Sequence, residues 1–397
     1  MYESVSISMV SAASAAAAFF ATYYTFYASQ KPQVFASSLK LRNFLDEHVQ
    51  LLKERYWPSP LYAGGHLQTI LGLSQRVTSP NKLPYRREIF TLSDGGEVAL
   101  DYMEIEQKSE RPLMVLFLPG LTSSSHTSYV RTLVQTINKS GASVVVFNNR
   151  GNGGVPFKTP KTYSASYIGD LEEVIAHLKQ KYPETRFVGL GTSLGGMVLA
   201  KYLVTKPLEA KNNFECALLL CIAWDCVQGS ENLEKPFINK YLINKELARG
   251  LRRLAKKFID KFPDVSLKFD PKLALSAKTV REFDSAVTAP QFGFPNVLEY
   301  YKSATTSGHV HKLSIPVFAL SAEDDPMCPG HLLPREEAVA ENSKLALITT
   351  ARGGHLGYLE GFGKSSTHYM ERLVGQLVEG IRVYGGAELT DLSNGHL

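Results

Sequence analysis

Residues 189–196 read Gly-Leu-Gly-Thr-Ser-Leu-Gly-Gly, and this stretch decides the fold that we expect for the chain. An apolar run typical of a strand precedes it, and residues 197–203 have the composition of a helix. Gly-x-Ser-x-Gly between a strand and a helix is the pattern of a nucleophile elbow, a sharp turn that exposes the hydroxyl of Ser193. The turn also places the amide of Leu194 at a helix N-terminus, where it can donate to a developing oxyanion.

Outside this stretch, apolar runs alternate with helical patterns along most of the chain. The expected strands are residues 113–118, 143–147, 186–190, 216–222, 316–321 and 345–350, and the expected helices between them include 129–138, 166–181 and 197–204. Strands that are apolar on both faces and alternate with helices indicate a mostly parallel sheet covered on both sides. The predicted class is therefore α/β, and the Gly-x-Ser-x-Gly turn at Ser193 favours the α/β-hydrolase fold within that class.

The alternation stops between residues 225 and 310, where helix-forming residues are followed by several prolines and aromatic residues. We predict a helical cap or lid inserted over the carboxyl edge of the sheet, because active sites of open α/β sheets lie at that edge. The alternative is helical decoration with no part in substrate choice. The whole hydrolase domain is predicted at residues 57–384, followed by a flexible tail at 385–397.

The N-terminal segment lacks charge from residue 5 to residue 28 and ends in several tyrosines. Its length suits one bilayer crossing, so residues 1–30 are predicted to be a membrane anchor, with a cleaved signal peptide as the alternative. Residues 35–56 show an amphipathic helical pattern, and 31–56 are taken as a helical linker. The positive charges after the span favour a cytosolic catalytic domain, but the bias is small.

Composition excludes several classes of function. The net charge of +5 is mild for 397 residues and no long basic run occurs, so nucleic-acid binding is not expected. The four cysteines form no Cys-x-x-Cys pair and are predicted to be free thiols in the core. No metal site, organic cofactor or obligate protein partner is indicated.

An aspartate and a histidine further along the chain complete a candidate catalytic triad with Ser193. Asp324 and Asp325 follow the expected strand 316–321, and His355, flanked by glycines, follows the expected strand 345–350. The chain order Ser, Asp, His is that of the α/β hydrolases. In this arrangement the serine attacks an acyl carbonyl, the histidine transfers the proton, and one aspartate holds the imidazole in its productive tautomer. The loop after strand 113–118 supplies a second oxyanion donor, and the amide of Leu121 is the candidate.

The chain resembles the membrane-anchored abhydrolase-domain branch of the α/β hydrolases, which includes the YheT-like hydrolases. The resemblance is nearest to the subgroup of abhydrolase domain-containing proteins one and three. The stretches that carry it are Gly65-His66-Leu67-Gln68-Thr69, Leu118-Pro119-Gly120-Leu121-Thr122, Asn148-Asn149-Arg150-Gly151, Ser193-Leu194-Gly195-Gly196-Met197, Arg281-Glu282-Phe283-Asp284 and Gly353-Gly354-His355-Leu356-Gly357. His66 lacks an obvious acidic partner and is not expected to be catalytic.

The resemblance implies a serine hydrolase triad of Ser193, Asp325 and His355. Asp325 is preferred over Asp324 because related hydrolases place the acid four residues before the proline that matches Pro329. The resemblance also implies an N-terminal anchor in a type II arrangement, which conflicts with the charge bias and leaves the orientation open. The implied substrates are acyl lipids, and the implied activity is that of a phospholipase A on phosphatidylcholines with medium or truncated chains.

Three functions remain to be separated. The leading hypothesis is hydrolysis of lipid esters. A second is a related use of the same acyl-enzyme, either as a monoacylglycerol lipase or in acyl transfer to an alcohol. The third is a non-catalytic lipid-binding or scaffold module, because a fold does not by itself imply activity.

Overall fold

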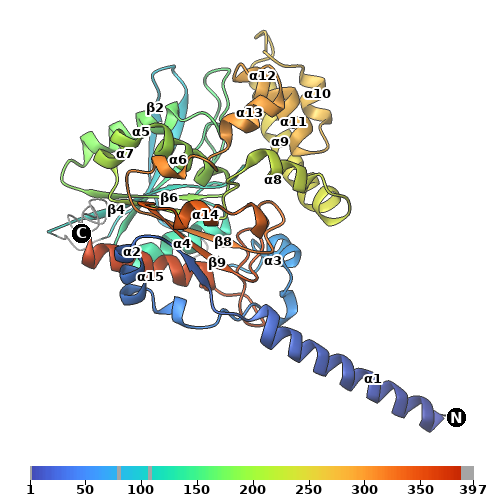
Figure 1. The fold of residues 1–397 in the computed structure, drawn as a ribbon. Coiled ribbons are helices and arrows are strands. Elements are labelled where there is room, and N and C mark those ends of the chain that lie inside the picture. The colour runs from blue at the N-terminus through green and yellow to red at the C-terminus, as the bar shows by residue number, and fades with distance from the viewer. Residues whose placement is uncertain (1, 78–81, 106–109, 386–397) are drawn as a thin grey trace.

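A twisted sheet runs through the centre of the protein, with helices on both faces (Figure 1). The computed structural model describes residues 2–77, 82–105 and 110–385. Within these residues, nine strands form one sheet in the order β1-β9-β8-β7-β6-β4-β5-β3-β2. The strands are β1 (Gln33–Phe35), β2 (Arg86–Thr91), β3 (Glu97–Met103), β4 (Leu113–Leu118), β5 (Ser143–Asn148), β6 (Arg186–Thr192), β7 (Cys216–Leu220), β8 (Val317–Ala322) and β9 (Leu345–Thr350).

The middle of the sheet is parallel, from β5 through β4, β6, β7 and β8 to β9. Every residue of β4, β7, β8 and β9 is buried, which is why these strands are apolar along most of their length rather than alternating. The antiparallel hairpin of β2 and β3 closes one edge. The sequence therefore predicted the six parallel strands β4 to β9 but not β1, β2 or β3. The carboxyl ends of the parallel strands form one edge that carries the site.

Two layers of helices bury the faces of the sheet. One layer contains α2 (Leu39–His48), α4 (Ser128–Lys139) and α15 (Tyr369–Tyr384). The other contains α5 (Gly169–Lys181), α6 (Leu194–Thr205), α7 (Pro207–Asn213) and α14 (Arg335–Val339). The four cysteines are free and buried, as predicted.

Helices fill the segment predicted as a cap, which stands to one side of the sheet (Figure 1). They are α8 (Cys226–Leu233), the π-helix η4 (Asn239–Asn244), α9 (Lys245–Lys261), α10 (Pro271–Ser276), α11 (Val280–Phe283), the π-helix η5 (Asp284–Thr288), α12 (Ala289–Gln291) and α13 (Val297–Ala304). Two apolar clusters hold them together, and Leu194 at the start of α6 packs against both. The cap therefore rests directly on the predicted nucleophile elbow.

The N-terminal helix α1 (Tyr2–Tyr23) extends away from the body of the protein and is followed by the π-helix η1 (Tyr24–Ala28) (Figure 1). The sequence predicted one membrane-crossing helix here, and the structure does not support it. Residues 11–18 consist only of Ala, which is weakly hydrophobic, and Ser, which is polar. Throughout the part of the chain that the structure describes, no helix is both long enough and apolar enough to cross a bilayer.

The predicted amphipathic helix over residues 35–56 is divided in the structure. Residues 33–35 form β1, which pairs antiparallel with β9, and α2 begins only at Leu39, followed by the 3₁₀-helix η2 (Gln50–Lys53). The amphipathic face of α2 packs on the sheet through Leu41, Phe44 and Leu45. The remaining domain boundaries stay predictions, and residues 386–397 of the predicted tail lie outside the described residues.

Candidate active site

Ser193 stands at the turn between β6 and α6 in a strained conformation. Its φ of 50° lies in the left-handed region, which non-glycine residues adopt only where the surroundings enforce it. The glycines of the motif allow the close packing that does so. A Cβ on Gly195 would lie 2.2 Å from the carbonyl oxygen of Leu118, and one on Gly191 would lie 2.4 Å from Cα of Gly196. Backbone contact across the turn therefore requires glycine at both positions.

The structure brings Ser193, His355 and Asp325 together from three strand ends. His355 Nε2 lies 2.8 Å from Ser193 Oγ, and His355 Nδ1 lies 2.9 Å from Asp325 Oδ2. Asp325 is 1% exposed and His355 is 9% exposed, so the contacts lie in a largely water-free environment. Both distances are within the range at which a serine proton can be passed to histidine and an aspartate can orient the ring.

Asp324 lies beside this group but does not contact the imidazole ring. Its Oδ1 accepts a hydrogen bond from the amide of Gly354 at 2.9 Å, next to His355 in the chain. Burial raises the pKa of Asp324 to about 6. Between the two adjacent aspartates, the geometry therefore directs Asp325 to the histidine ring and Asp324 to the backbone of the histidine loop.

The helix α3 (Gly65–Leu71) supports the histidine loop, a role that the sequence analysis did not foresee. Thr69 Oγ1 accepts from the amide of His355 at 2.8 Å, and Gln68 exchanges two hydrogen bonds with the backbone of Leu359. His66, from the same stretch, bonds instead to Asn239 of the cap at 2.7 Å. The resemblance had marked residues 65–69, but their partners lie nearly three hundred residues away in sequence, so the role was not visible there.

The loop after β4 lies against Ser193 and carries the predicted oxyanion donor Leu121. A Cβ on Gly120 would lie 3.3 Å from Cβ of Ser193, so the two turns are in contact. Tyr129 Oη accepts from the amide of Gly120 at 2.8 Å and thereby fixes the loop. Within the described residues, the amides of Leu121 and Leu194 have no hydrogen-bond partner, which leaves both available to a substrate oxygen.

The Asn-Asn-Arg-Gly stretch supports this loop from behind rather than contacting the site. Asn148 Oδ1 accepts from the amide of Ser125 at 2.8 Å, and Asn148 Nδ2 donates to Asp101 at 2.9 Å. Arg150 forms a two-pronged pair with Asp170 at 2.6 and 2.7 Å. Asn148 thus holds the loop after β4 in place, and Arg150 ties the end of β5 to α5, so the stretch is structural.

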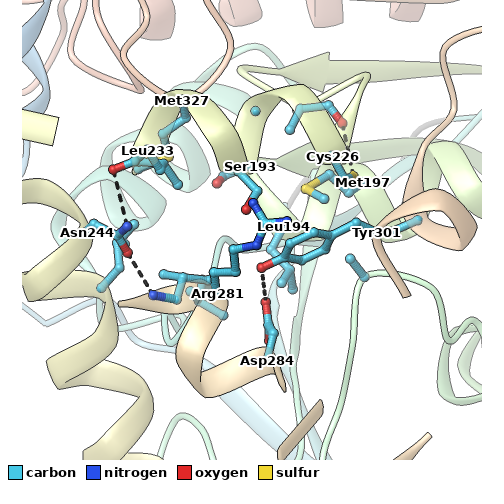
Figure 2. A pocket seen from close by; sticks show the side chains of 18 of the residues that line it. Ser193, Leu194, Met197, Cys226, Leu233, Asn244, Arg281, Asp284, Tyr301 and Met327 are labelled. Atoms are coloured by element: carbon cyan, nitrogen blue, oxygen red, sulfur yellow. Dashed lines mark hydrogen bonds between the residues drawn. The ribbon is translucent and has the colours of Figure 1, made fainter. Parts of the chain in front are cut away.

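Two cavities meet at Ser193. The first, of about 120 Å³, lies beneath the cap and is lined mostly by apolar side chains, including Met197, Cys226 and Tyr301 (Figure 2). The second, of about 560 Å³, lies between α3, the loop after β4 and α9. Ser193 and His355 line both cavities, so a substrate with two arms can occupy both sides of the reacting bond. Among the residues described, no group of His, Cys, Asp and Glu side chains is arranged to hold a metal ion.

A serine at a strained strand-to-helix turn, in contact with a histidine that contacts an aspartate, at the carboxyl edge of a parallel sheet, defines the α/β hydrolases as a class. Comparison with known proteins leads to the same class. The α/β hydrolase fold family matches residues 114–362. The chain belongs to this family.

Relatives of known description refine this result. The chain is 34% identical to human phospholipase ABHD3 over 90% of its own length and 86% of that protein. It is 30% identical to the yeast medium-chain fatty acid ethyl ester synthase/esterase 2 (Saccharomyces cerevisiae), covering 65% of this chain and 60% of that protein. The esterase PF2001 of Pyrococcus furiosus has a similar fold, with a TM-score of 0.50 at 15% identity, over 78% of this chain and 94% of that one.

These relatives confirm the prediction of a carboxylic ester hydrolase and the resemblance to abhydrolase domain-containing proteins. Assignment to the YheT-like branch stays a prediction. The roles of the individual site residues rest on the geometry described above.

Proposed function

We propose that this protein is a serine hydrolase that cleaves the carboxylic esters of acyl lipids through Ser193, His355 and Asp325. The observation that carries the proposal is the pair of contacts that join these three side chains, 2.8 and 2.9 Å long, at a strained turn open to two cavities. A serine with only a structural role requires neither a strained backbone at its own position nor a hydroxyl that faces a cavity.

In the proposed reaction, Ser193 Oγ attacks the ester carbonyl while His355 Nε2 takes its proton. The amides of Leu121 and Leu194 donate to the oxyanion of the tetrahedral intermediate. His355 then protonates the leaving alcohol, which leaves an acyl group on Ser193. Water, activated by the same histidine, releases the fatty acid and restores the serine.

We assign the substrate to phospholipids, and specifically to phosphatidylcholines with medium-length or truncated acyl chains. Phospholipase is the activity in the name of the human relative, and medium-chain esters are named for the yeast relative. The small apolar cavity beneath the cap, with a volume of about 120 Å³, supports a short or medium acyl chain.

We also propose that the enzyme takes its substrate from a lipid surface. Ile70, Leu73 and Leu242 line the larger cavity, and each is more than two-fifths exposed. Further exposed apolar side chains lie on α3, just before η4 and within η4: Leu67, Phe237, Ile238 and Tyr241. The hydrogen bond between His66 and Asn239 joins these two elements. An apolar rim around a cavity that leads to Ser193 suits the transfer of a lipid.

Acyl transfer to an alcohol is the second candidate. It is favoured by the yeast relative, which is named as both an ester synthase and an esterase. The acyl-enzyme is the same, and only the attacking group differs. Product analysis with added ethanol separates the two, because ethyl esters form only if an alcohol competes with water.

The first test is labelling with a fluorophosphonate probe, comparing the wild type with Ser193→Ala. We expect labelling that the variant abolishes, followed by turnover of short-chain phosphatidylcholines by the wild type alone. A folded wild-type protein that neither labels nor hydrolyses any ester would refute the assignment of the triad and favour a non-catalytic lipid-binding module.

A further inference from the structure

A single arginine faces the cavity beneath the cap. Arg281 of α11 lines the same cavity as Ser193 and His355, and Figure 2 shows its side chain extending toward Ser193 and Leu194. Most of the surrounding side chains are apolar. Arg281 is partly buried. Its guanidinium carries a permanent charge and five donors, and taking part of such a group out of water is costly unless it meets an anion.

Within the described residues, Arg281 has no hydrogen bond and no ion pair to another side chain. The other charged side chains of the cavity are already engaged. Asp284 accepts from Thr288 at 2.6 Å and from Tyr301 at 3.0 Å. Glu234 accepts from Asn244 at 3.0 Å and pairs with Lys240 at 3.4 Å. The protein therefore leaves the cation of this cavity without an anionic partner.

We propose that Arg281 binds the phosphodiester of a phospholipid whose ester bond lies at Ser193. This inference rests on the proposed function and names the group that selects its substrate. In a phospholipid the phosphate is attached to the same glycerol as the scissile ester, so the two groups enter one site together. Arginine suits this group because its planar fork can donate two hydrogen bonds to phosphate oxygens.

The remaining space is consistent with this placement. A smaller cavity of about 60 Å³ continues from the first and shares Leu121, Leu194, Val280, Asp284 and Tyr300 with it. Its deeper lining is apolar, with Leu254, Phe258 and Phe283. An acyl chain can thus lie along the apolar side while the phosphate stays beside Arg281.

The experiment compares two short-chain substrates that differ in the phosphocholine head group: dihexanoyl phosphatidylcholine and dihexanoylglycerol. For Arg281→Gln we expect kcat/KM to fall roughly 10- to 100-fold on the phospholipid, the range of a lost hydrogen bond to a charged group, and less than about threefold on the neutral ester. Arg281→Lys should recover part of the loss. Lys256→Gln, in which the replaced lysine pairs with Asp260 on the exposed side of α9, is the control and should change neither rate.

Several outcomes would overturn the proposal. If Arg281→Gln lowers kcat/KM equally on both substrates, or on neither, then Arg281 does not bind the phosphate. A selective loss for Arg253→Gln instead would place the phosphate in the larger cavity, which Arg253 lines. Inhibition of neutral-ester hydrolysis by millimolar inorganic phosphate that Arg281→Gln abolishes, without a selective loss on the phospholipid, would assign the site to the free ion.

Failure of the proposed function gives a different result. A wild-type enzyme that hydrolyses dihexanoylglycerol but not the phospholipid would refute phospholipase activity and this inference together. A wild type active on both, with an unselective Arg281→Gln variant, would refute the inference alone. Fluorophosphonate labelling of Ser193 at the wild-type rate shows that the variant retains its nucleophile.

Discussion

Replacing Asp325 by Asn is expected to abolish most of the activity without unfolding the protein. Asp325 Oδ1 accepts from the amides of Met327 at 2.7 Å and Cys328 at 3.2 Å, while Oδ2 faces His355. Because those two amides are donors, the carbonyl oxygen of Asn must take the place of Oδ1. Its NH₂ group then faces Nδ1 and moves the ring proton to Nε2. A histidine protonated at Nε2 cannot accept the proton of Ser193.

The magnitude follows from the loss of the productive tautomer. In a Ser-His-Asp site this substitution costs about 10⁴-fold in kcat, or about 5 kcal/mol of transition-state stabilisation. The adjacent Asp324 provides the matched control. Asn at 324 can still accept from the amide of Gly354, and it replaces a carboxyl whose pKa burial has already raised to about 6. We expect Asp324→Asn to change kcat by less than roughly threefold, since the hydrogen bond remains.

The assay is the initial rate with a soluble ester, together with the rate of fluorophosphonate labelling and the thermal unfolding curve of each variant. The reasoning fails if Asp325→Asn unfolds like the wild type and keeps about a tenth or more of its kcat. It also fails if Asp324→Asn loses as much activity as Asp325→Asn, because the geometry assigns the ring contact to Asp325 alone.

Three further predictions concern stability and positioning. Burial raises the pKa of Asp284 to about 6, so the native state binds its proton more tightly than the unfolded chain does. Loss of this proton should lower the free energy of unfolding by up to roughly 3 kcal/mol as pH rises from about 4 to about 7. Urea titrations of Asp284→Asn over the same pH range should lack that fall. Thr69→Val removes the acceptor of the His355 amide and should lower kcat roughly tenfold with KM little changed; an unaltered kcat would contradict the positioning role. Gly195→Ala forces a Cβ to 2.2 Å from the carbonyl oxygen of Leu118 and should destabilise the fold by roughly 1–3 kcal/mol in urea unfolding, and a variant as stable as the wild type would show that the turn can relax.

Local patterns determined the parallel sheet and the position of the serine and histidine. The apolar strands and the strand, Gly-x-Ser-x-Gly, helix order are properties of neighbouring residues, so one sequence was enough to predict β4 to β9 and the turn at Ser193. The prediction of a continuous helix over residues 35–56 was wrong because it, too, used only the local pattern. Residues 33–35 form a strand only because β9 lies beside them, and no local pattern revealed that pairing.

Tertiary structure decided which side chains meet at the site. Asp324 and Asp325 are neighbours in sequence, and only the path of the histidine loop directs one to the ring and the other to a backbone amide. Thr69 reaches the same loop from α3, and Arg281 reaches the cavity of Ser193 from the cap. The physical reason is that such contacts join segments far apart in the chain. Their partners are set by the packing of α3 and the cap on the sheet, and this packing is a property of the whole fold rather than of any stretch.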